Sequence, residues 1–194
     1  MELGHRLIEE FVRESLEENS KGAHTFDHTK RVYALSMKIG EDAGANLKTL
    51  GAAALLHDVA RPMEREAGIS HSILSGEMSR RVLDKAGYDS EEIASVIDTI
   101  RTHRFSEGLE PNSLEGKILS DVDKLDAMGA IGVFRAIAQA ESTGVGIKGF
   151  LDHADEKLLR LKDLIYTEGA LAIAEERHRT LEAFVLQLRD ELHS

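Results

Sequence analysis

The sequence contains no cysteine and only two prolines among its 194 residues. Without cysteine, the protein has no disulfide, no thiolate nucleophile and no cysteine-ligated zinc. No apolar run approaches the roughly 20 residues that a membrane-spanning helix needs, so we expect no membrane partner. The acidic, amphipathic start MELGHRLIEEFVRESLEENS lacks the basic beginning and apolar centre of a signal peptide. These absences favour a cytoplasmic protein.

Positive charge is also scarce, because 24 Lys and Arg face 35 Asp and Glu, for a formal net charge of -11. This excess of negative charge disfavours nonspecific binding to DNA or RNA, so we expect no nucleic-acid partner. A small anionic substrate stays open if a metal ion or local arginines override the overall field. The chain length fits one domain with a proper core.

Almost every segment has the apolar period of a helix, and none alternates like a strand. We predict a first helix that ends between 19 and 22, and a helix from Ser90 as N-cap to a loop at 104–112. The other predicted helices are at about 28–42, 47–60, 71–86 with Ser70 as N-cap, 113–127, 129–142, 150–166 and 168–191. The glycine-bearing segment 142–149 is predicted to be a surface loop or lid. The sequence thus predicts an all-α fold of about seven to nine helices in a single domain, residues 1–194. Its core would lie at about 20–130, with the C-terminal helices at 150–191 packed on it.

Four histidines lie in helical phase with the apolar residues of four separate helices, and Asp58 adds a carboxylate beside one of them. They are His28, His57, His71 and His103. Any one of them alone is more often a core histidine bonded to a carbonyl than a metal ligand. Together, as unpaired buried groups at roughly 2–7 kcal/mol each, they would consume most of the roughly 5–15 kcal/mol net stability of a domain. A bound divalent metal resolves this, because neutral imidazoles and carboxylates are its ligands.

Three motifs occur in the order H…HD…D: HTFDHTKRV with His28, LLHDVA with His57 and Asp58, and ILSDVDKLDAMGAIGVFR. This set resembles the signature of the HD-superfamily metal-dependent phosphohydrolases. The segments LEGKILSDVDKLDAMGAIG and EKLLRLKDLIYTEGALAIAEERHRTLEAF look like a bacterial subgroup with nucleotide pyrophosphohydrolase activity. The similarity extends from about residue 20 to 190. It implies an HD-domain helical bundle and a divalent metal, often manganese, cobalt, nickel or iron, with magnesium as an alternative.

The resemblance implies His28, His57, Asp58 and Asp123 as the metal ligands. Asp123 is chosen because family members place this ligand in an Asp-basic-Leu sequence, which Asp123, Lys124 and Leu125 match. Helical phase does not decide between the aspartates, so Asp121 is the fallback.

His71 and His103 are not reliably histidine in the pyrophosphohydrolase subgroup. Binuclear members have the order H…HD…H…H…D, in which these two residues would bind a second ion and Asp58 would bridge the pair. Alternatively, both are pocket histidines that contact the substrate phosphate. One or two ions per chain are therefore expected.

Asp58 is the ligand best placed to orient or deprotonate an attacking water, and His71 or His103 could protonate the leaving group. Basic side chains near the ligands are candidates for binding the substrate phosphate, with surface charge as the alternative interpretation. They are Arg31, Arg61, Arg104 and Lys124. Glu64 and Glu66 are either an acid/base pair, as in some relatives, or solvated loop residues.

The leading hypothesis is hydrolysis of a (deoxy)nucleoside triphosphate to the monophosphate and pyrophosphate. The nearest alternative is a phosphomonoesterase that acts on nucleoside monophosphates or a related metabolite. A di-iron oxygenase with the same ligand order, or a regulatory domain that keeps the metal without turnover, are further alternatives. Exposed apolar positions on the last two helices would permit a homodimer.

Overall fold

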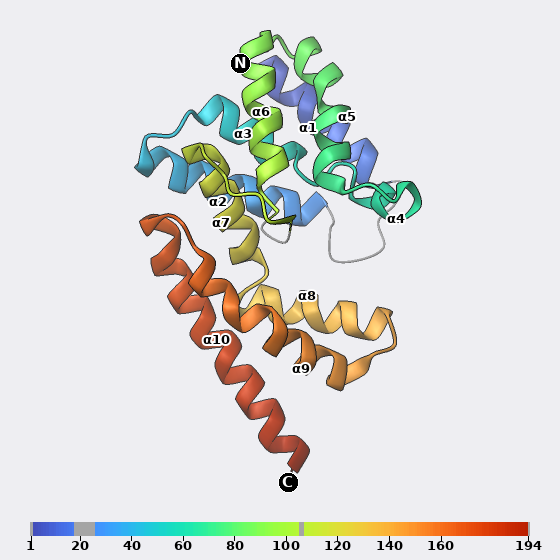
Figure 1. Cartoon of the computed structure of the whole chain (residues 1–194), viewed down its shortest axis with the longest axis vertical. Helices are drawn as coiled ribbons and strands as arrows, with labels where there is room; N and C mark the ends of the chain where they lie inside the picture. Colours follow the sequence, from blue (N-terminus) through green and yellow to red (C-terminus); the bar gives the residue numbers. More distant parts are fainter. Residues whose placement is uncertain (1, 18–25, 105–106, 194) are drawn as a thin grey trace. The chain divides into compact units, whose positions relative to one another are not determined.

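A computed structural model of the protein describes residues 2–17, 26–104 and 107–193. These residues form helices and no strand, with nine α-helices of ten or more residues besides the single-turn α4 (Figure 1). The predicted all-α fold class is confirmed. The predicted end of the first helix, between 19 and 22, lies outside the described residues. No helix among those described combines the length and the apolar character that a membrane crossing requires.

The chain divides into two compact units, Met1–Ser120 and Asp121–Ser194. The division falls inside one helix, α7 (Leu114–Asp126), so the two units are continuous along the chain. The single domain over residues 1–194 stays a prediction, and each unit is described by itself.

The first unit is built around α3 (Leu47–Leu56), which contacts four other helices. They are α1 (Glu2–Glu17), α2 (Phe26–Ala43), α5 (His71–Lys85) and α6 (Ser90–Thr102). Every residue of α3 from Thr49 to Leu56 is buried. The sequence explains this, because alanine, leucine and glycine cover all sides of the helix and a helix that is apolar all round belongs in a core. The next two residues in the chain, His57 and Asp58, therefore begin their path inside the protein.

Two helix starts show how local side chains fix the ends of α5 and α6. The Ser70 side chain accepts a hydrogen bond from the backbone N–H of Ser72, so the predicted N-cap of α5 is confirmed. The predicted N-cap Ser90 is wrong. Asp89 caps α6 instead, in a capping box with Glu92, and Ser90 is the first helical residue. An ionised carboxylate that accepts two backbone N–H groups is the better cap here.

Between α3 and α5 the chain forms two short turns of helix, η1 (Arg61–Met63) and α4 (Glu64–Ala67). Gly68 ends α4 with a φ of 63°, a left-handed conformation that favours glycine. The turn before η1 is also tied to α5, since the backbone N–H of Ala60 donates to Ser75 Oγ at 3.1 Å. This connection brings the start of α5 back toward the end of α3.

The second unit contains α8 (Gly129–Ser142), α9 (Gly146–Glu156), η3 (Leu158–Leu164) and α10 (Glu168–His193). Within it, α8 packs on α9 and α10, and η3 packs on the same two helices. The predicted helix at 150–166 is therefore two elements, and the predicted loop at 142–149 is shorter. Gly144 and Gly146 turn the chain with φ values of 72° and 56°, after which α9 starts at once. Exposed apolar side chains lie along α10, the helix on which the predicted homodimer in part depends: Leu171, Leu186 and Leu192.

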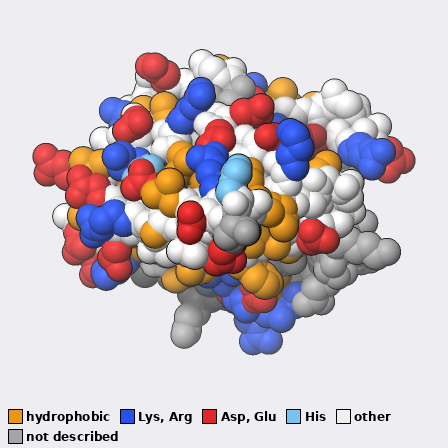
Figure 2. Space-filling view, turned by 90° about the horizontal axis from the view of Figure 1, so that it is seen from below, with side chains coloured by type: hydrophobic (Ala, Val, Ile, Leu, Met, Phe, Trp, Pro, Cys, Tyr) orange, Lys and Arg blue, Asp and Glu red, His pale blue; other side chains and the backbone are white. Residues whose placement is uncertain are grey.

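Acidic and basic side chains lie interspersed on the face shown in Figure 2, with hydrophobic side chains between them. The formal net charge of -11 belongs to the whole chain, and basic side chains are still present among the acidic ones on this face. A local cluster of basic residues can override this overall charge within roughly one Debye length, about 8 Å at physiological salt.

We expect Leu50→Ala to lower the free energy of unfolding by about 2–5 kcal/mol, because it leaves a cavity in the core. Leu50 is fully buried in α3, whereas Leu3 of α1 is 74% exposed. Urea denaturation of both variants measures the difference. An equal effect of Leu50→Ala and Leu3→Ala would contradict the central position of α3.

Candidate metal centre

Three buried side chains meet where the first turn of α2 faces the end of α3: His28, His57 and Asp58. One ligand atom from each lies within 4.8 Å of the other two. The Nε2 atoms of the two histidines are 3.3 Å apart. Asp58 Oδ2 is 3.6 Å from His28 Nε2 and 3.7 Å from His57 Nε2. The structure thus brings together three of the predicted metal ligands.

The hydrogen bond on the far side of His57 decides which of its nitrogens carries the proton. His57 Nδ1 lies 2.9 Å from the carbonyl oxygen of Ala54. A carbonyl oxygen only accepts, so Nδ1 carries the proton, and in the neutral form of the ring the lone pair of Nε2 faces His28 and Asp58. This is the tautomer that a metal-binding histidine needs, with its other nitrogen held by an acceptor. Imidazole nitrogen and carboxylate oxygen in such proximity fit a divalent transition metal.

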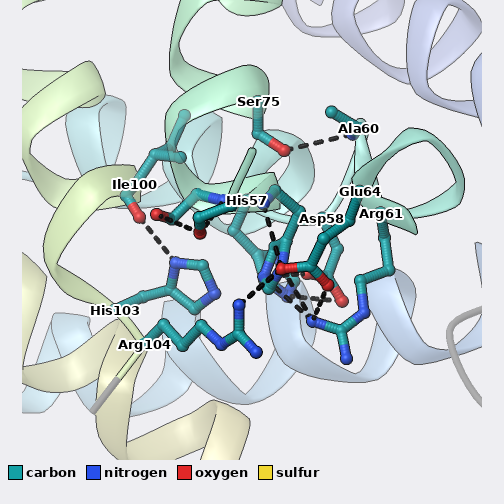
Figure 3. A network of polar contacts seen from close by, with 12 residues as sticks. His57, Asp58, Ala60, Arg61, Glu64, Ser75, Ile100, His103 and Arg104 are labelled. Atoms are coloured by element: carbon teal, nitrogen blue, oxygen red, sulfur yellow. Dashed lines mark hydrogen bonds and ion pairs between the residues drawn. The ribbon is translucent and has the colours of Figure 1, made fainter. Parts of the chain in front are cut away.

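A second buried group, Asp58, His71 and His103, shares its carboxylate with the first. Asp58 Oδ1 is 3.0 Å from His71 Nε2, while Oδ2 is the oxygen that faces His28 and His57. His103 Nδ1 donates to the carbonyl oxygen of Ile100 at 2.5 Å, as Figure 3 shows. His103 Nε2 is therefore an acceptor in the neutral ring, as His57 Nε2 is.

His71 differs from His57 and His103 because its Nδ1 has a donor and an acceptor beside it. Glu64 Oε1 lies 3.0 Å from this nitrogen and Arg61 Nη1 lies 2.7 Å from it. Either tautomer of His71 thus finds a partner. When Arg61 donates to Nδ1, the proton is on Nε2 and faces Asp58, and this is the arrangement that a proton donor requires.

Two arginines, Arg61 and Arg104, lie beside Asp58, Glu64 and His103 (Figure 3). Arg61 Nη1 is 3.4 Å from Glu64 Oε2, and Arg104 Nη1 is 2.5 Å from Glu64 Oε1. Arg104 also lies 3.4 Å from a carboxylate oxygen of Glu107. The side chains of these four residues are 20% to 31% exposed, in contrast to the buried histidines. This basic and acidic group is the part of the centre within reach of a dissolved anion.

Glu64 and Glu107 are both ionised near neutral pH. Partial burial raises the pKa of Glu64, but hydrogen bonds from His71 and the charges of His71 and Arg61 outweigh it and lower the pKa to about 2. Partial burial likewise opposes ionisation of Glu107, whereas hydrogen bonds from Ser70 and Ser72 and the charge of Arg104 lower its pKa. Both glutamates therefore carry the negative charge that the arginines attract.

The family model of the HD domain matches residues 25–128. This range is more than half of the chain, and it contains His28, the His57–Asp58 doublet and the predicted ligand Asp123. The chain belongs to the HD-domain family.

Relatives of this HD-domain protein are similar over nearly its whole length. YpgQ of Bacillus subtilis is 35% identical over 199 residues, which cover 95% of this chain and 92% of YpgQ. The crystal structure of YpgQ in complex with ADP matches with a TM-score of 0.80 at 30% identity, over 96% of this chain and 97% of that one. A predicted HD-superfamily hydrolase from an uncultured Thermotogales bacterium matches with a TM-score of 0.73 at 32% identity, over 96% and 92%.

The other predicted site residues of the HD domain lie on α2 and α7. Arg31 is half-buried on α2, three residues after His28. Asp123 and Lys124 lie in the part of α7 that belongs to the second unit. There the Lys124 ammonium lies 4.7 Å from the centre of the Tyr166 ring and 3.6 Å from Asp121 Oδ1. Burial lowers the pKa of Lys124 more than the neighbouring Asp121 and Asp123 raise it.

Asp121, the fallback ligand, has a clear role within the second unit. Its carboxylate accepts hydrogen bonds from the backbone N–H of Tyr166 at 2.9 Å and from the N–H and hydroxyl of Thr167 at 2.8 Å each. These bonds fix the chain just before α10, so Asp121 is committed to the fold of this unit. The choice of Asp123 as the aspartate for the metal stays a prediction with this additional support.

Sequence reasoning did not identify the partners that orient His71. Glu107 accepts hydrogen bonds from the hydroxyls of Ser70 and Ser72, and thereby holds the start of α5. For Glu64, the sequence allows two interpretations, a member of an acid/base pair or a solvated loop residue. No periodic signal marks either residue, since both lie outside the long helices and several of their partners are 7 to 40 residues away.

We expect Mn²⁺ to raise the melting temperature of the EDTA-treated protein. An ion that binds the folded state alone stabilises it by about 2.7 kcal/mol at 100 times its dissociation constant. Asp58→Asn keeps the size of the side chain but removes its charge, so the shift should disappear. The control His153→Ala, at an exposed position of α9, should keep it. A wild-type protein that does not respond to Mn²⁺, Co²⁺, Ni²⁺ or Fe²⁺ would contradict the metal centre.

Proposed function

We propose that the protein is a metal-dependent phosphohydrolase that converts a (deoxy)nucleoside triphosphate to the monophosphate and pyrophosphate. The observation that carries this proposal is the buried Asp58 carboxylate, whose two oxygens face different histidines. Two comparisons support it: YpgQ was crystallised with ADP, and another similar protein is described as a predicted HD-superfamily hydrolase. A nucleotide is therefore the proposed ligand of this chain.

His28, His57, Asp58 and Asp123 would hold one divalent ion, of manganese, cobalt, nickel, iron or magnesium. Such an ion lowers the pKa of a bound water and stabilises negative charge on phosphate oxygens. The surroundings of His71 favour one ion over two. Arg61 Nη1 lies 2.7 Å from one ring nitrogen of His71 and 3.3 Å from the other, so its positive charge opposes a second cation there.

Different residues at this centre would accept the proton of the attacking water and donate a proton to the leaving group. Asp58 and His103 present acceptor atoms, which orient the attacking water and take its proton. His71 supplies a proton to the oxygen that leaves when the bond between phosphorus and the bridging oxygen breaks. His103 is less suited to that step, because its Nδ1–H is held by the Ile100 carbonyl and the other nitrogen has no proton in the neutral ring. Arg31, Arg61, Arg104 and Lys124 are the proposed phosphate-binding residues.

We expect one metal ion per chain in protein loaded with Mn²⁺ and freed of excess metal. Elemental analysis by mass spectrometry, with the protein concentration measured on the same sample, checks this. His71→Gln and His103→Gln should keep the ion, whereas His57→Gln should lose it. Two ions per chain in the wild type, falling to one in His71→Gln and His103→Gln, would establish the binuclear alternative instead.

We expect phosphorus NMR to show a nucleoside monophosphate and pyrophosphate as the products of a deoxynucleoside triphosphate. Reaction in ¹⁸O-labelled water then identifies the attacked phosphorus: label in the monophosphate indicates the α-phosphorus, and label in pyrophosphate the β-phosphorus. His71→Gln should lower kcat by about 10²- to 10⁴-fold, the usual contribution of a general acid.

Two controls separate this reaction from its alternatives. Activity under an oxygen-free atmosphere excludes an oxygenase, and its loss in Asp58→Asn ties it to this centre. Release of orthophosphate in place of pyrophosphate would contradict the proposal and favour a phosphomonoesterase. A metal-loaded wild-type protein that turns over no nucleotide would favour a regulatory domain.

A further inference from the structure

The carboxylate of Glu64 lies between two guanidinium groups that come from distant parts of the first unit. Arg61 precedes it in η1, and Arg104 follows α6, 40 residues further along the chain. Both arginines contact Glu64, at 3.4 Å and 2.5 Å. Two cations held this close repel each other unless an anion lies between them. Glu64 is that anion in the structure (Figure 3).

The position of Glu64 is next to the proposed reaction centre. Glu64 Oε1 lies 3.0 Å from His71 Nδ1, and the other ring nitrogen of His71 lies 3.0 Å from Asp58 Oδ1. Guanidinium groups bind the oxygens of a carboxylate and of a phosphate with the same paired N–H geometry. A phosphoryl group that approaches His71 from the accessible side would therefore meet arginines that already hold an anion.

From this geometry we infer that Glu64 is a resident anion in a phosphoryl subsite formed by Arg61 and Arg104. The substrate phosphate displaces the Glu64 carboxylate from the two guanidinium groups when it binds. This inference rests on the proposed function, since it takes the ligand to be a nucleotide or pyrophosphate. It makes Glu64 a residue that weakens anion binding and restricts the subsite to ligands with enough negative charge to replace a carboxylate.

Glu107 is not equivalent to Glu64, although it also contacts Arg104. Its carboxylate accepts hydrogen bonds from the hydroxyls of Ser70 and Ser72, the N-cap and the second residue of α5. These bonds hold Glu107 at a helix N-terminus, where a negative charge is stabilised. Glu64 lies instead in the single turn of α4, which Gly68 ends, and its side-chain contacts are with the two arginines and His71. Glu64 is thus the carboxylate that can exchange for a phosphate.

In a Glu64→Gln variant we expect tighter phosphate binding together with slower turnover. The amide keeps the shape of the side chain but carries no charge, so the arginines lose their competing anion and bind phosphate more tightly. The partly exposed ion pairs involved correspond to an increase in affinity of about fivefold. At the same time the side chain beside Nδ1 of His71 loses its negative charge, which changes the surroundings of the proposed proton donor, so kcat should fall. A residue that merely supports the fold would not lower KM and kcat together.

Titration calorimetry with ADP and with inorganic pyrophosphate tests this on the Mn²⁺-loaded full chain. Glu64→Gln should bind both ligands about fivefold more tightly than the wild type at low salt, and the gain should shrink at high salt. The matched control is Glu66→Gln, which removes the same charge from an exposed residue of α4 and should bind as the wild type does. The gain should be smaller when Glu64→Gln is made in an Arg104→Met background, with Arg104→Met alone as the reference.

The possible outcomes distinguish a failure of the Glu64 inference from a failure of the proposed function. If the wild type binds these ligands and Glu64→Gln binds them equally or less tightly, the role of Glu64 as a resident anion is wrong, while the proposed function still holds. A wild-type protein that binds neither ADP nor pyrophosphate would overturn the proposed function and this inference with it. Circular dichroism and the melting temperature confirm that the variants are folded.

Discussion

A buried carboxylate surrounded by imidazoles is the constraint on which the rest of this protein depends. Asp58 is 3% exposed, and each of its oxygens faces a different side of the centre. Taking such a charge out of water is costly unless cations and hydrogen-bond donors surround it. The surrounding histidines do not supply the required positive charge when they are neutral. A bound cation would supply it, which explains why His57 and His103 each present an acceptor nitrogen, Nε2, in the neutral ring.

The architecture of the first unit makes this arrangement rigid. The helix α3 is buried on all sides, so the doublet at its end cannot turn toward solvent. His57 and His103 are each held through Nδ1 by a carbonyl oxygen three residues earlier in the chain. The same local bond at the ends of two different helices sets the same tautomer twice. The fold thus orients the Nε2 atoms of both histidines without an ion, because a backbone carbonyl holds the other nitrogen of each ring, as is usual for histidines in metal sites.

Beside this centre, basic side chains gather in an otherwise acidic protein. The chain carries an excess of acidic residues, yet Arg61 and Arg104 converge beside His71. Their charge is balanced by Glu64 and Glu107, so the basic group does not stand alone. Such a balanced group stays stable without a ligand and still offers guanidinium groups to a phosphate. This arrangement suits a small anionic substrate, which needs only a few arginines and no broad basic surface.

The sequence by itself determined what depends on neighbours along the chain. The helical period located α8 and α10 almost to the residue, and it showed that His28, His57, His71 and His103 share the apolar faces of their helices. The family signature then separated a metal centre from four unrelated core histidines. Even so, a cap that depends on one side chain was misplaced from Asp89 to Ser90, since several residues in that stretch can cap a helix.

Only the tertiary structure decided what depends on contacts between distant segments. The contacts of the two Asp58 oxygens with different histidines and the ion pair of Arg104 with Glu64 both join residues from different elements. Periodicity reports which face of a helix is buried, but it carries no information on which buried atoms meet. Glu64 and Glu107 lie in short turns with no period, so their hydrogen-bond partners become visible only when α4, α5 and the end of α6 are folded together.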